Sequence, residues 1–229
     1  PDTSDYKQQT DLSCKLPNPS GPVESRFSDI GEQEEGGRPT RPLPYVLGVH
    51  EVRGPKEYFT LQFENFGTVG ACFYVYQDHS HEKPRRYTVG AGSTLQDCWK
   101  IPLNDLVKFT VIGPNGFARY FHRNGQTSVL VSTTENAATG TLSVTLANRT
   151  KRLQSISIRD NAYGQPIQVV KLAAGAIVSK TLDLAKSNHW YDISVKNHME
   201  PYTENRFAGH VETGRPSLTD PALHKPILQ

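Results

Sequence analysis

The stretch Tyr58-Phe59-Thr60-Leu61-Gln62-Phe63-Glu64-Asn65 decides the fold class of this chain. Hydrophobic residues occupy every second position, and the turn signal Asn65-Phe66-Gly67 follows directly. A period of two is typical of a half-buried β-strand, because successive side chains point to opposite faces of a sheet. The stretch therefore predicts an antiparallel strand that ends in a turn.

Similar short runs follow along the chain, each bounded by turn residues. After the first strand they cover residues 71–76, 86–89, 94–101 and 106–112. This spacing is typical of a small antiparallel sandwich. No segment keeps the i, i+3, i+4, i+7 pattern of an amphipathic helix, so the sequence predicts an all-β fold.

The strand pattern occurs twice. Val144-Thr145-Leu146-Ala147-Asn148 matches residues 61–65 at a distance of 83 positions, and Leu172-Ala173-Ala174-Gly175-Ala176 matches residues 89–93 at the same distance. A constant offset of this size indicates a duplicated domain rather than a solenoid repeat. We therefore predict two tandem antiparallel β-sandwich domains, at residues 45–126 and 127–229, the second with an irregular tail.

Residues 1–44 have a different composition. They are rich in proline, contain the acidic cluster Glu32-Gln33-Glu34-Glu35, and show almost no hydrophobic periodicity. Because proline fixes φ and lacks an N–H donor, we expect a linker or a segment draped over the surface. The first residues lack Met, a basic region and a hydrophobic region, so we expect an internal start.

The overall charge restricts the partners. Lys and Arg number 25 and Asp and Glu 23, which gives a net charge of +2. This is far from the basic excess of nucleic-acid-binding proteins, so no nucleic acid is expected. No apolar run approaches the roughly 18 residues of a membrane span. Cys14, Cys72 and Cys98 lack zinc-site spacing, and their pairing stays open.

Five stretches together resemble a known family. They are 41–45, 71–76, 84–89, Gly113-Pro114-Asn115-Gly116-Phe117-Ala118-Arg119-Tyr120-Phe121, and 207–221 with Phe207-Ala208-Gly209-His210-Val211 at its start. As a set they look like the C-terminal tandem repeat region of bacterial phosphocholine-preferring phospholipases C, enzymes of the alkaline-phosphatase-like hydrolase superfamily. The resemblance covers essentially the whole chain.

The resemblance implies an exported parent phospholipase C that hydrolyses phosphatidylcholine or sphingomyelin. In that family the catalytic machinery lies in a larger N-terminal domain, so this chain is expected to hold no catalytic residue, metal or cofactor. Its expected partner is the N-terminal catalytic domain of the same polypeptide, and its expected localisation is secreted or periplasmic.

One compact group of residues combines the side-chain types that bind metal ions. Asp78-His79-Ser80-His81-Glu82 offers two imidazoles and flanking carboxylates. Alternating residues in a polar hairpin connection need not converge on one ion, and we favour that interpretation.

A basic and aromatic set provides candidate contacts with a phospholipid surface. Guanidinium groups pair with phosphate, and aromatic rings favour the membrane interface. The candidates are Arg85, Arg86, Tyr87, Arg119, Tyr120 and Arg123. The alternative is that they are solvated strand edges, where positive charge discourages pairing between sheets.

These observations predict a non-catalytic accessory region that packs on the catalytic domain and aids lipid-surface engagement. Two alternatives stay open. One is a purely structural or export-partner module without lipid contact. The other is a freestanding carbohydrate-binding β-sandwich, for which Tyr74, Tyr76 and Tyr87 are the only support.

Overall fold

The computed structural model describes residues 37–55, 57–78, 82–101 and 105–224, and it confirms the predicted all-β fold. Apart from the short 3-10 helices η2 (Ala185–Ser187) and η3 (Pro221–His224), the regular structure in these residues is antiparallel β-strand. No helix in this part of the chain is long and apolar enough to span a membrane. Most of the linker predicted for residues 1–44 lies outside the described residues.

The first half of the described chain forms two sheets of strands that pack face to face. Its strands are β2 (Leu47–Val52), β3 (Tyr58–Asn65), β4 (Ala71–Gln77), β5 (Arg85–Val89), β6 (Ser93–Lys100), β7 (Leu106–Ile112) and β8 (Ala118–Asn124). Strands β2, β3 and β6 form a three-stranded sheet, and the others belong to an eight-stranded sheet.

The second half repeats this arrangement. Its strands are β9 (Val129–Asn136), β10 (Thr141–Asn148), β11 (Gln154–Asp160), β12 (Gln168–Leu172), β13 (Ile177–Asp183), β14 (Trp190–Asn197) and β15 (Glu204–His210). Strands β9, β10 and β13 form the second three-stranded sheet, in the same order as their counterparts in the first half.

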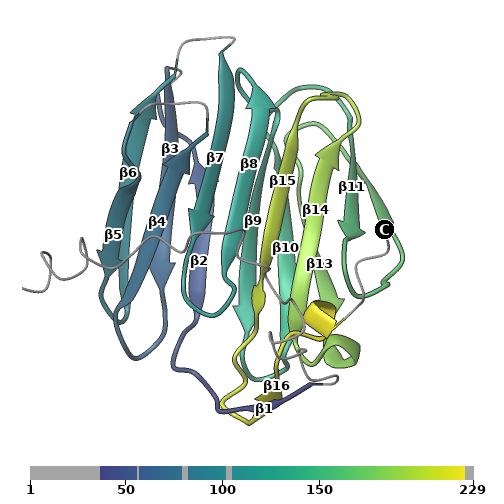
Figure 1. Ribbon diagram of the computed structural model, residues 1–229. Coiled ribbons are helices and arrows are strands. Elements are labelled where there is room, and N and C mark those ends of the chain that lie inside the picture. The colour runs from purple at the N-terminus through teal and green to yellow at the C-terminus, as the bar shows by residue number, and fades with distance from the viewer. Residues whose placement is uncertain (1–36, 56, 79–81, 102–104, 225–229) are drawn as a thin grey trace, which may run out of the picture. The chain divides into compact units, whose positions relative to one another are not determined.

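The eight-stranded sheet runs through both halves in the order β12-β11-β14-β15-β8-β7-β4-β5 (Figure 1). Its two central strands, β8 and β15, are each the last strand of their half, and they pair antiparallel with Tyr120 opposite Arg206. In the other layer, the equivalent first strands β2 and β9 lie beside each other. The two halves are therefore related by an approximate twofold axis that passes near Tyr120 and Arg206.

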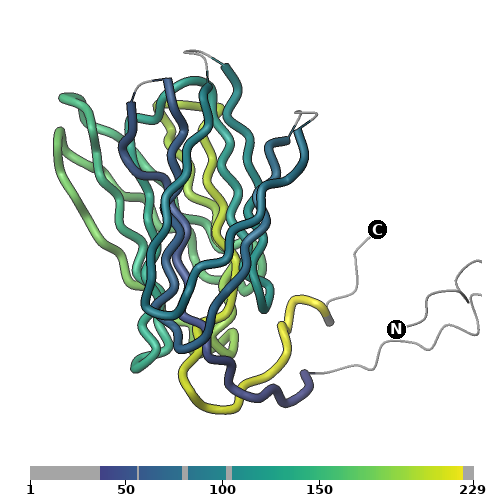
Figure 2. Tube along the Cα trace, turned by 90° about the vertical axis from the view of Figure 1, so that its left-hand side faces the viewer, coloured from purple at the N-terminus to yellow at the C-terminus, as the bar shows by residue number. Residues whose placement is uncertain are grey.

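Each half has its own hydrophobic core between two layers of strands. Figure 2 shows the layers from the β5–β6 edge. In the first half, Phe63 of β3 and Phe73 of β4 are fully buried and their ring centroids lie 5.6 Å apart. In the second half, Leu146 of β10 packs in one cluster with Ile156 of β11. Burying one such side chain stabilises the fold by about 1.5–3 kcal/mol. The two cores are separate, but one sheet joins the two halves. The predicted division into domains at 45–126 and 127–229 therefore stays a prediction.

A pair of buried asparagines marks the repeat at atomic detail. Asn65 donates from Nδ2 to the carbonyls of Val69 and Val89, at 2.8 and 3.0 Å. Asn148 donates to the carbonyls of Arg152 and Leu172, which stand at the same sequence distances from it, at 2.7 and 3.1 Å. Each asparagine thus fastens the turn that follows its strand to the neighbouring sheet.

Segments from near the two ends of the described chain pair with each other. Strand β1 (Pro39–Thr40) forms a short antiparallel ladder with β16 (Ser217–Leu218), seen at the bottom of Figure 1. Trp190 of β14 donates from Nε1 to the carbonyl of Leu218 at 2.9 Å, which ties this ladder to the second half.

Candidate interaction surface

The outer face of the eight-stranded sheet carries exposed tyrosines on β4. Alternation along this strand sends Phe73 and Val75 into the core, where they are 0% and 2% exposed. Tyr74 and Tyr76 point the opposite way and are 40% and 38% exposed. The strand therefore has large, mostly apolar side chains on both faces. One face packs in the core, and the other can contact a partner.

Neighbouring strands extend this surface. Tyr74 lies opposite Ile112 of β7 on one side and Arg86 of β5 on the other, and the Arg86 guanidinium carbon lies 6.0 Å from the Tyr74 ring centroid. Tyr120 of β8 lies on the same face, opposite Thr110. We call Tyr74, Tyr76, Arg86, Ile112 and Tyr120 the tyrosine patch.

The tyrosine patch has the composition of a contact surface. Aromatic residues and arginine are enriched at protein interfaces, and tyrosine also favours the water–lipid boundary. Each ring combines a large apolar area with a polar hydroxyl tip. Beside the patch, Arg206 of β15 lies over the Tyr120 ring at 5.4 Å and pairs with Asp192, which fixes the guanidinium there.

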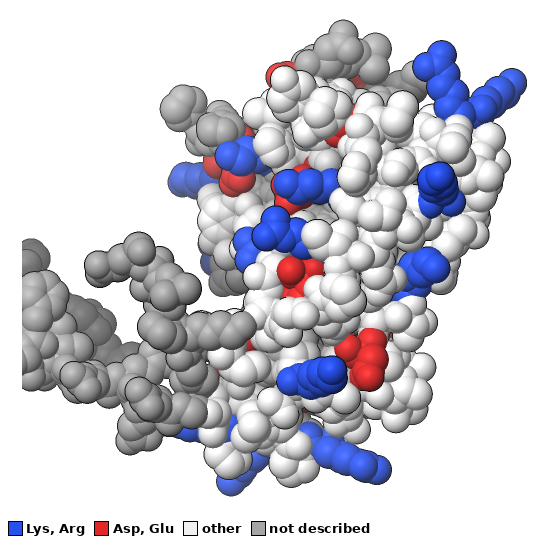
Figure 3. All heavy atoms as spheres, turned by 90° about the vertical axis from the view of Figure 1, so that its right-hand side faces the viewer, with Lys and Arg blue, Asp and Glu red and all other residues white. Residues whose placement is uncertain are grey.

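Basic side chains elsewhere are more dispersed. On the side of the molecule beyond β11, Lys and Arg are spread over the surface with a few carboxylates between them (Figure 3). Such an arrangement gives no concentrated field, in keeping with the net charge of +2.

Two candidates for lipid contact, Arg85 and Tyr87, instead join the two layers at the β5–β6 edge. Both bind Asp97 of β6, Arg85 from Nη1 at 2.9 Å and Tyr87 from its hydroxyl at 2.5 Å. Partial burial alone would raise the pKa of Asp97, but hydrogen bonds from Tyr87 and the Cys98 amide, together with Arg85, hold it below its usual range. Burial and the same carboxylate raise the pKa of Tyr87.

Arg123 lies in the interior rather than on the expected surface. It is 4% exposed, and it donates from Nη1 and Nη2 to the two carboxylate oxygens of Glu51 at 2.7 and 2.6 Å. This bidentate pair joins β8 to β2, so Arg123 does not belong to a lipid-facing surface.

Arg119 is also interior, and it connects the two halves. It is 0% exposed. Its guanidinium donates to the carbonyl of Ala208 at 2.7 Å and to the Tyr191 hydroxyl at 2.9 Å, and it lies 3.8 Å from the Phe117 ring centroid. Of the six candidates, Arg86 and Tyr120 are therefore the two that the structure brings together on one exposed face.

A half-buried carboxylate, Glu135, stands beside Arg119. Glu135 of β9 accepts hydrogen bonds from the Tyr191 hydroxyl, at 2.8 Å, and from the backbone N–H of Leu47. Burial raises the pKa of Glu135 to about 7, although Arg119 and these hydrogen bonds act in the opposite direction. The sequence does not mark Glu135 as a special residue, because nothing in its own strand distinguishes it from a solvent-exposed glutamate.

The remaining chemical groups show no metal site in the part of the chain that the structure describes. No three or more His, Cys, Asp or Glu side chains gather there, and residues 79–81 of the 78–82 group lie outside it. Cys72 and Cys98 are free and exposed, so they do not pair with each other here.

Some members of the tyrosine patch were not among the candidate contacts. Tyr74 and Tyr76 were predicted only as support for the carbohydrate alternative, and Ile112 was not predicted as a contact. The available signal was the phase of alternation, which shows that Tyr74 and Tyr76 share a face opposite to Phe73 and Val75. The sequence does not show which of these two apolar faces points outward.

The geometry defines a class of protein: an antiparallel β-sandwich region built twice in tandem, with a tyrosine-rich outer sheet face. The chain belongs to the family described as the C-terminal domain of bacterial phospholipase C, which matches residues 39–123 and 129–210. The resemblance read from the sequence is thereby confirmed, and the two matched segments coincide with the two halves of the fold.

Curated relatives are named phospholipases C. The non-hemolytic phospholipase C of Pseudomonas aeruginosa is 33% identical over 234 residues, covering 97% of this chain and 33% of that protein. The non-hemolytic phospholipase C of Burkholderia pseudomallei is 35% identical, covering 88% and 30%. The hemolytic phospholipase C of P. aeruginosa is 31% identical, covering 83% and 30%. The chain therefore spans about a third of the length of these relatives.

Proposed function

We propose that this chain is the non-catalytic C-terminal accessory region of a secreted bacterial phospholipase C that acts on phosphatidylcholine or sphingomyelin. Its family match and its coverage of about a third of each relative support a role beside a separate, larger catalytic domain. In this proposal the region packs on that domain, in the same polypeptide, and helps it to engage lipid surfaces.

The tyrosine patch is the observation that carries the accessory role. A sheet face that exposes three tyrosines and an isoleucine around an arginine can contact a lipid interface without opening its core. Tyrosine hydroxyls remain hydrated at headgroup level while the rings lie deeper. A single arginine beside an anionic membrane adds about 1 kcal/mol, so aromatic contact rather than charge would dominate on neutral lipid.

Vesicle co-sedimentation tests this role. The wild-type chain is mixed at low salt with phosphatidylcholine vesicles, alone or with added phosphatidylserine. The triple variant Tyr74→Ser, Tyr76→Ser, Tyr120→Ser should lose binding to the neutral vesicles and most of its binding to the anionic ones. Arg86→Ser should lose about fivefold on the anionic vesicles and little on the neutral ones.

A matched control uses exposed apolar residues outside the patch. Val169 and Tyr202 are 62% and 68% exposed, and the double variant Val169→Ser, Tyr202→Ser should sediment like wild type. If wild type ignores both kinds of vesicle, lipid engagement is wrong and the structural or export-partner role becomes the better account.

The same tyrosines support one other function, binding of carbohydrate, because aromatic rings on a sheet face can stack on sugar rings. Titration of the wild-type chain with soluble oligosaccharides, followed by tyrosine fluorescence, separates the two. Saturable quenching by a sugar that disappears in the triple variant, without vesicle binding, would favour the carbohydrate module.

The non-catalytic part of the proposal has its own test. The purified chain should not turn over a chromogenic phosphocholine ester. Turnover that scales with protein concentration and survives repurification would contradict it.

A further inference from the structure

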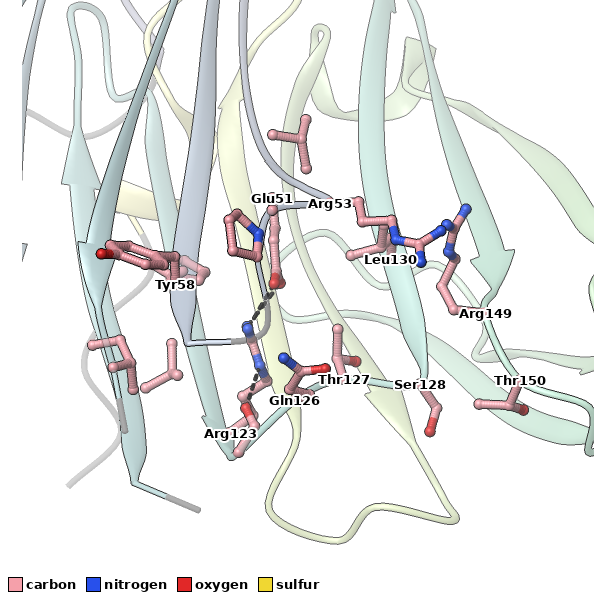
Figure 4. Close-up of a pocket in the computed structure, with 17 residues that line it drawn as sticks. Glu51, Arg53, Tyr58, Arg123, Gln126, Thr127, Ser128, Leu130, Arg149 and Thr150 are labelled. Carbon is pink, nitrogen blue, oxygen red and sulfur yellow. Dashed lines mark hydrogen bonds and ion pairs between the residues drawn. The ribbon is translucent and has the colours of Figure 1, made fainter. Parts of the chain in front are cut away.

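A groove opens between the two halves of the fold, away from the tyrosine patch (Figure 4). Its volume is about 500 Å³. Residues 53–55 after β2 line it from the first half, and residues 149–150 after β10 line it from the second. The connection 125–128 between β8 and β9 lines it as well.

Two arginines from different halves converge on this groove. Arg53 and Arg149 are both exposed, and Figure 4 shows their guanidinium groups pointing toward one another. Neither has an ion pair or a side-chain hydrogen bond to any residue within the described ranges, unlike Arg85, Arg123 and Arg206. Two like charges that face a common space without a counter-ion repel each other, and an anion between them removes that repulsion.

The other charges of the groove do not neutralise this pair. Glu51, on the groove wall, is already bound in a bidentate pair by Arg123 (Figure 4). Ser128 lines the groove beside Arg149, and its hydroxyl bonds no other group among the residues the structure describes. It can therefore donate to a bound oxygen.

The opposite end of the junction between the halves differs from the groove end. There the chain supplies an anion of its own, the buried carboxylate of Glu212. Glu212 accepts hydrogen bonds from the Leu43 amide at 2.9 Å and from Asn115 at 2.8 Å, and its Oε1 lies 2.9 Å from His210 Nδ1. At the groove end two carboxylates are near, but both have other partners: Glu51 is bound by Arg123, and Glu200 accepts a hydrogen bond from the Ser128 amide at 3.0 Å. Within the described residues neither forms an ion pair with Arg53 or Arg149.

We propose that this groove binds a phosphate group, held between the guanidinium groups of Arg53 and Arg149. Arginine suits this ligand because its planar donors match two phosphate oxygens at once. The phosphate belongs either to a small soluble phosphate or to the headgroup of an anionic phospholipid. The site is separate from the tyrosine patch and does not depend on the lipid role proposed for it.

Calorimetric titration of the whole chain with inorganic phosphate at low ionic strength tests the soluble source. Arg53→Gln and Arg149→Gln should each weaken binding about tenfold or more, as expected for loss of a hydrogen bond between charged groups. The matched control is Arg159→Gln, an exposed arginine of β11 outside the groove, which should bind phosphate like wild type. All three variants should keep the wild-type melting temperature.

Vesicles of phosphatidylcholine with phosphatidic acid test the lipid source. The groove takes a lipid headgroup if two results are obtained. Arg53→Gln and Arg149→Gln must each reduce vesicle binding. The variant Tyr74→Ser, Tyr76→Ser, Tyr120→Ser must keep a residual, salt-sensitive part of that binding. Binding of inorganic phosphate without that effect on vesicles assigns it to a soluble phosphate. The proposal fails if wild type binds neither probe, or if Arg159→Gln weakens binding as much as the groove variants.

Discussion

Arg119 of the first half donates a hydrogen bond from Nη2 to the hydroxyl of Tyr191 in the second half, at a distance of 2.9 Å. Both side chains are buried. Tyr191 in turn donates to Glu135. A positive guanidinium and a carboxylate thus share one hydroxyl at the junction of the halves, so the stability of the junction should depend on all three groups.

Replacing Arg119 should be costly. Arg119→Met removes the donors to Ala208 and Tyr191 and leaves Glu135 without its nearby positive charge, and breaking such a buried arrangement costs about 3–5 kcal/mol. Arg206→Met removes a partly exposed ion pair with Asp192 and should cost about 1 kcal/mol or less. Urea unfolding of both variants measures the difference. Equal costs would show that the buried arginine does not hold the junction.

Glu135 should make the stability of the protein depend on pH. Its pKa is raised from 4.5 to about 7 in the folded state. Between these values the unfolded chain has lost the proton while the folded chain keeps it, so the free energy of unfolding falls as pH rises through this interval. From the lower to the upper end of this pH interval, the free energy of unfolding of wild type should fall by roughly 3 kcal/mol more than that of Glu135→Gln.

The comparison with Glu135→Gln is needed because His50 titrates in the same interval with the opposite sign. Burial lowers the pKa of His50, so its protonation penalises the folded state as pH falls below 6.5. Urea unfolding at several pH values isolates Glu135 as the difference between the two proteins. Parallel pH profiles would contradict a raised pKa at Glu135.

The two equivalent asparagines should contribute similarly. Asn65→Ala leaves the carbonyls of Val69 and Val89 without their side-chain donor, and an unsatisfied buried group costs about 1–3 kcal/mol. Asn148→Ala should cost about as much for the same reason. Asn124→Ala, at an exposed position, serves as the control and should change stability by about 0.5 kcal/mol or less. Thermal unfolding of the three variants checks this, and a neutral Asn65→Ala would refute the proposed fastening role.

The two halves should fold when they are expressed separately as residues 45–126 and 127–229, because each contains its own hydrophobic core. Both should be less stable than the whole chain. Separation exposes the paired edges of β8 and β15, and it leaves Arg119 without its hydrogen-bond partner Tyr191. Circular dichroism and amide exchange provide the measurement. Two unfolded fragments would mean that the halves form one cooperative unit.

The sequence by itself determined the strand content, the duplication and the family. These features are local or periodic: a period of two predicts a strand whatever it packs against, and a constant offset of 83 positions reveals the repeat without any knowledge of contacts. The turn signal at Asn65 and its repeat at Asn148 indicated where these strands end, and the structure shows that both side chains hold the turns that follow.

Only the tertiary structure decided which way each face points. Alternation along β8 shows that Arg119, Phe121 and Arg123 share one face and Tyr120 the other, but basic residues on a strand normally face solvent. Arg119 and Arg123 face inward because Tyr191 and Glu51 accept their hydrogen bonds there. Each of these partners stands 72 positions away in the chain, so the sequence around the arginines does not reveal it. The groove between Arg53 and Arg149 depends in the same way on strands from different halves. Contacts of this kind arise from the packing of distant segments, and no local pattern in the sequence encodes them.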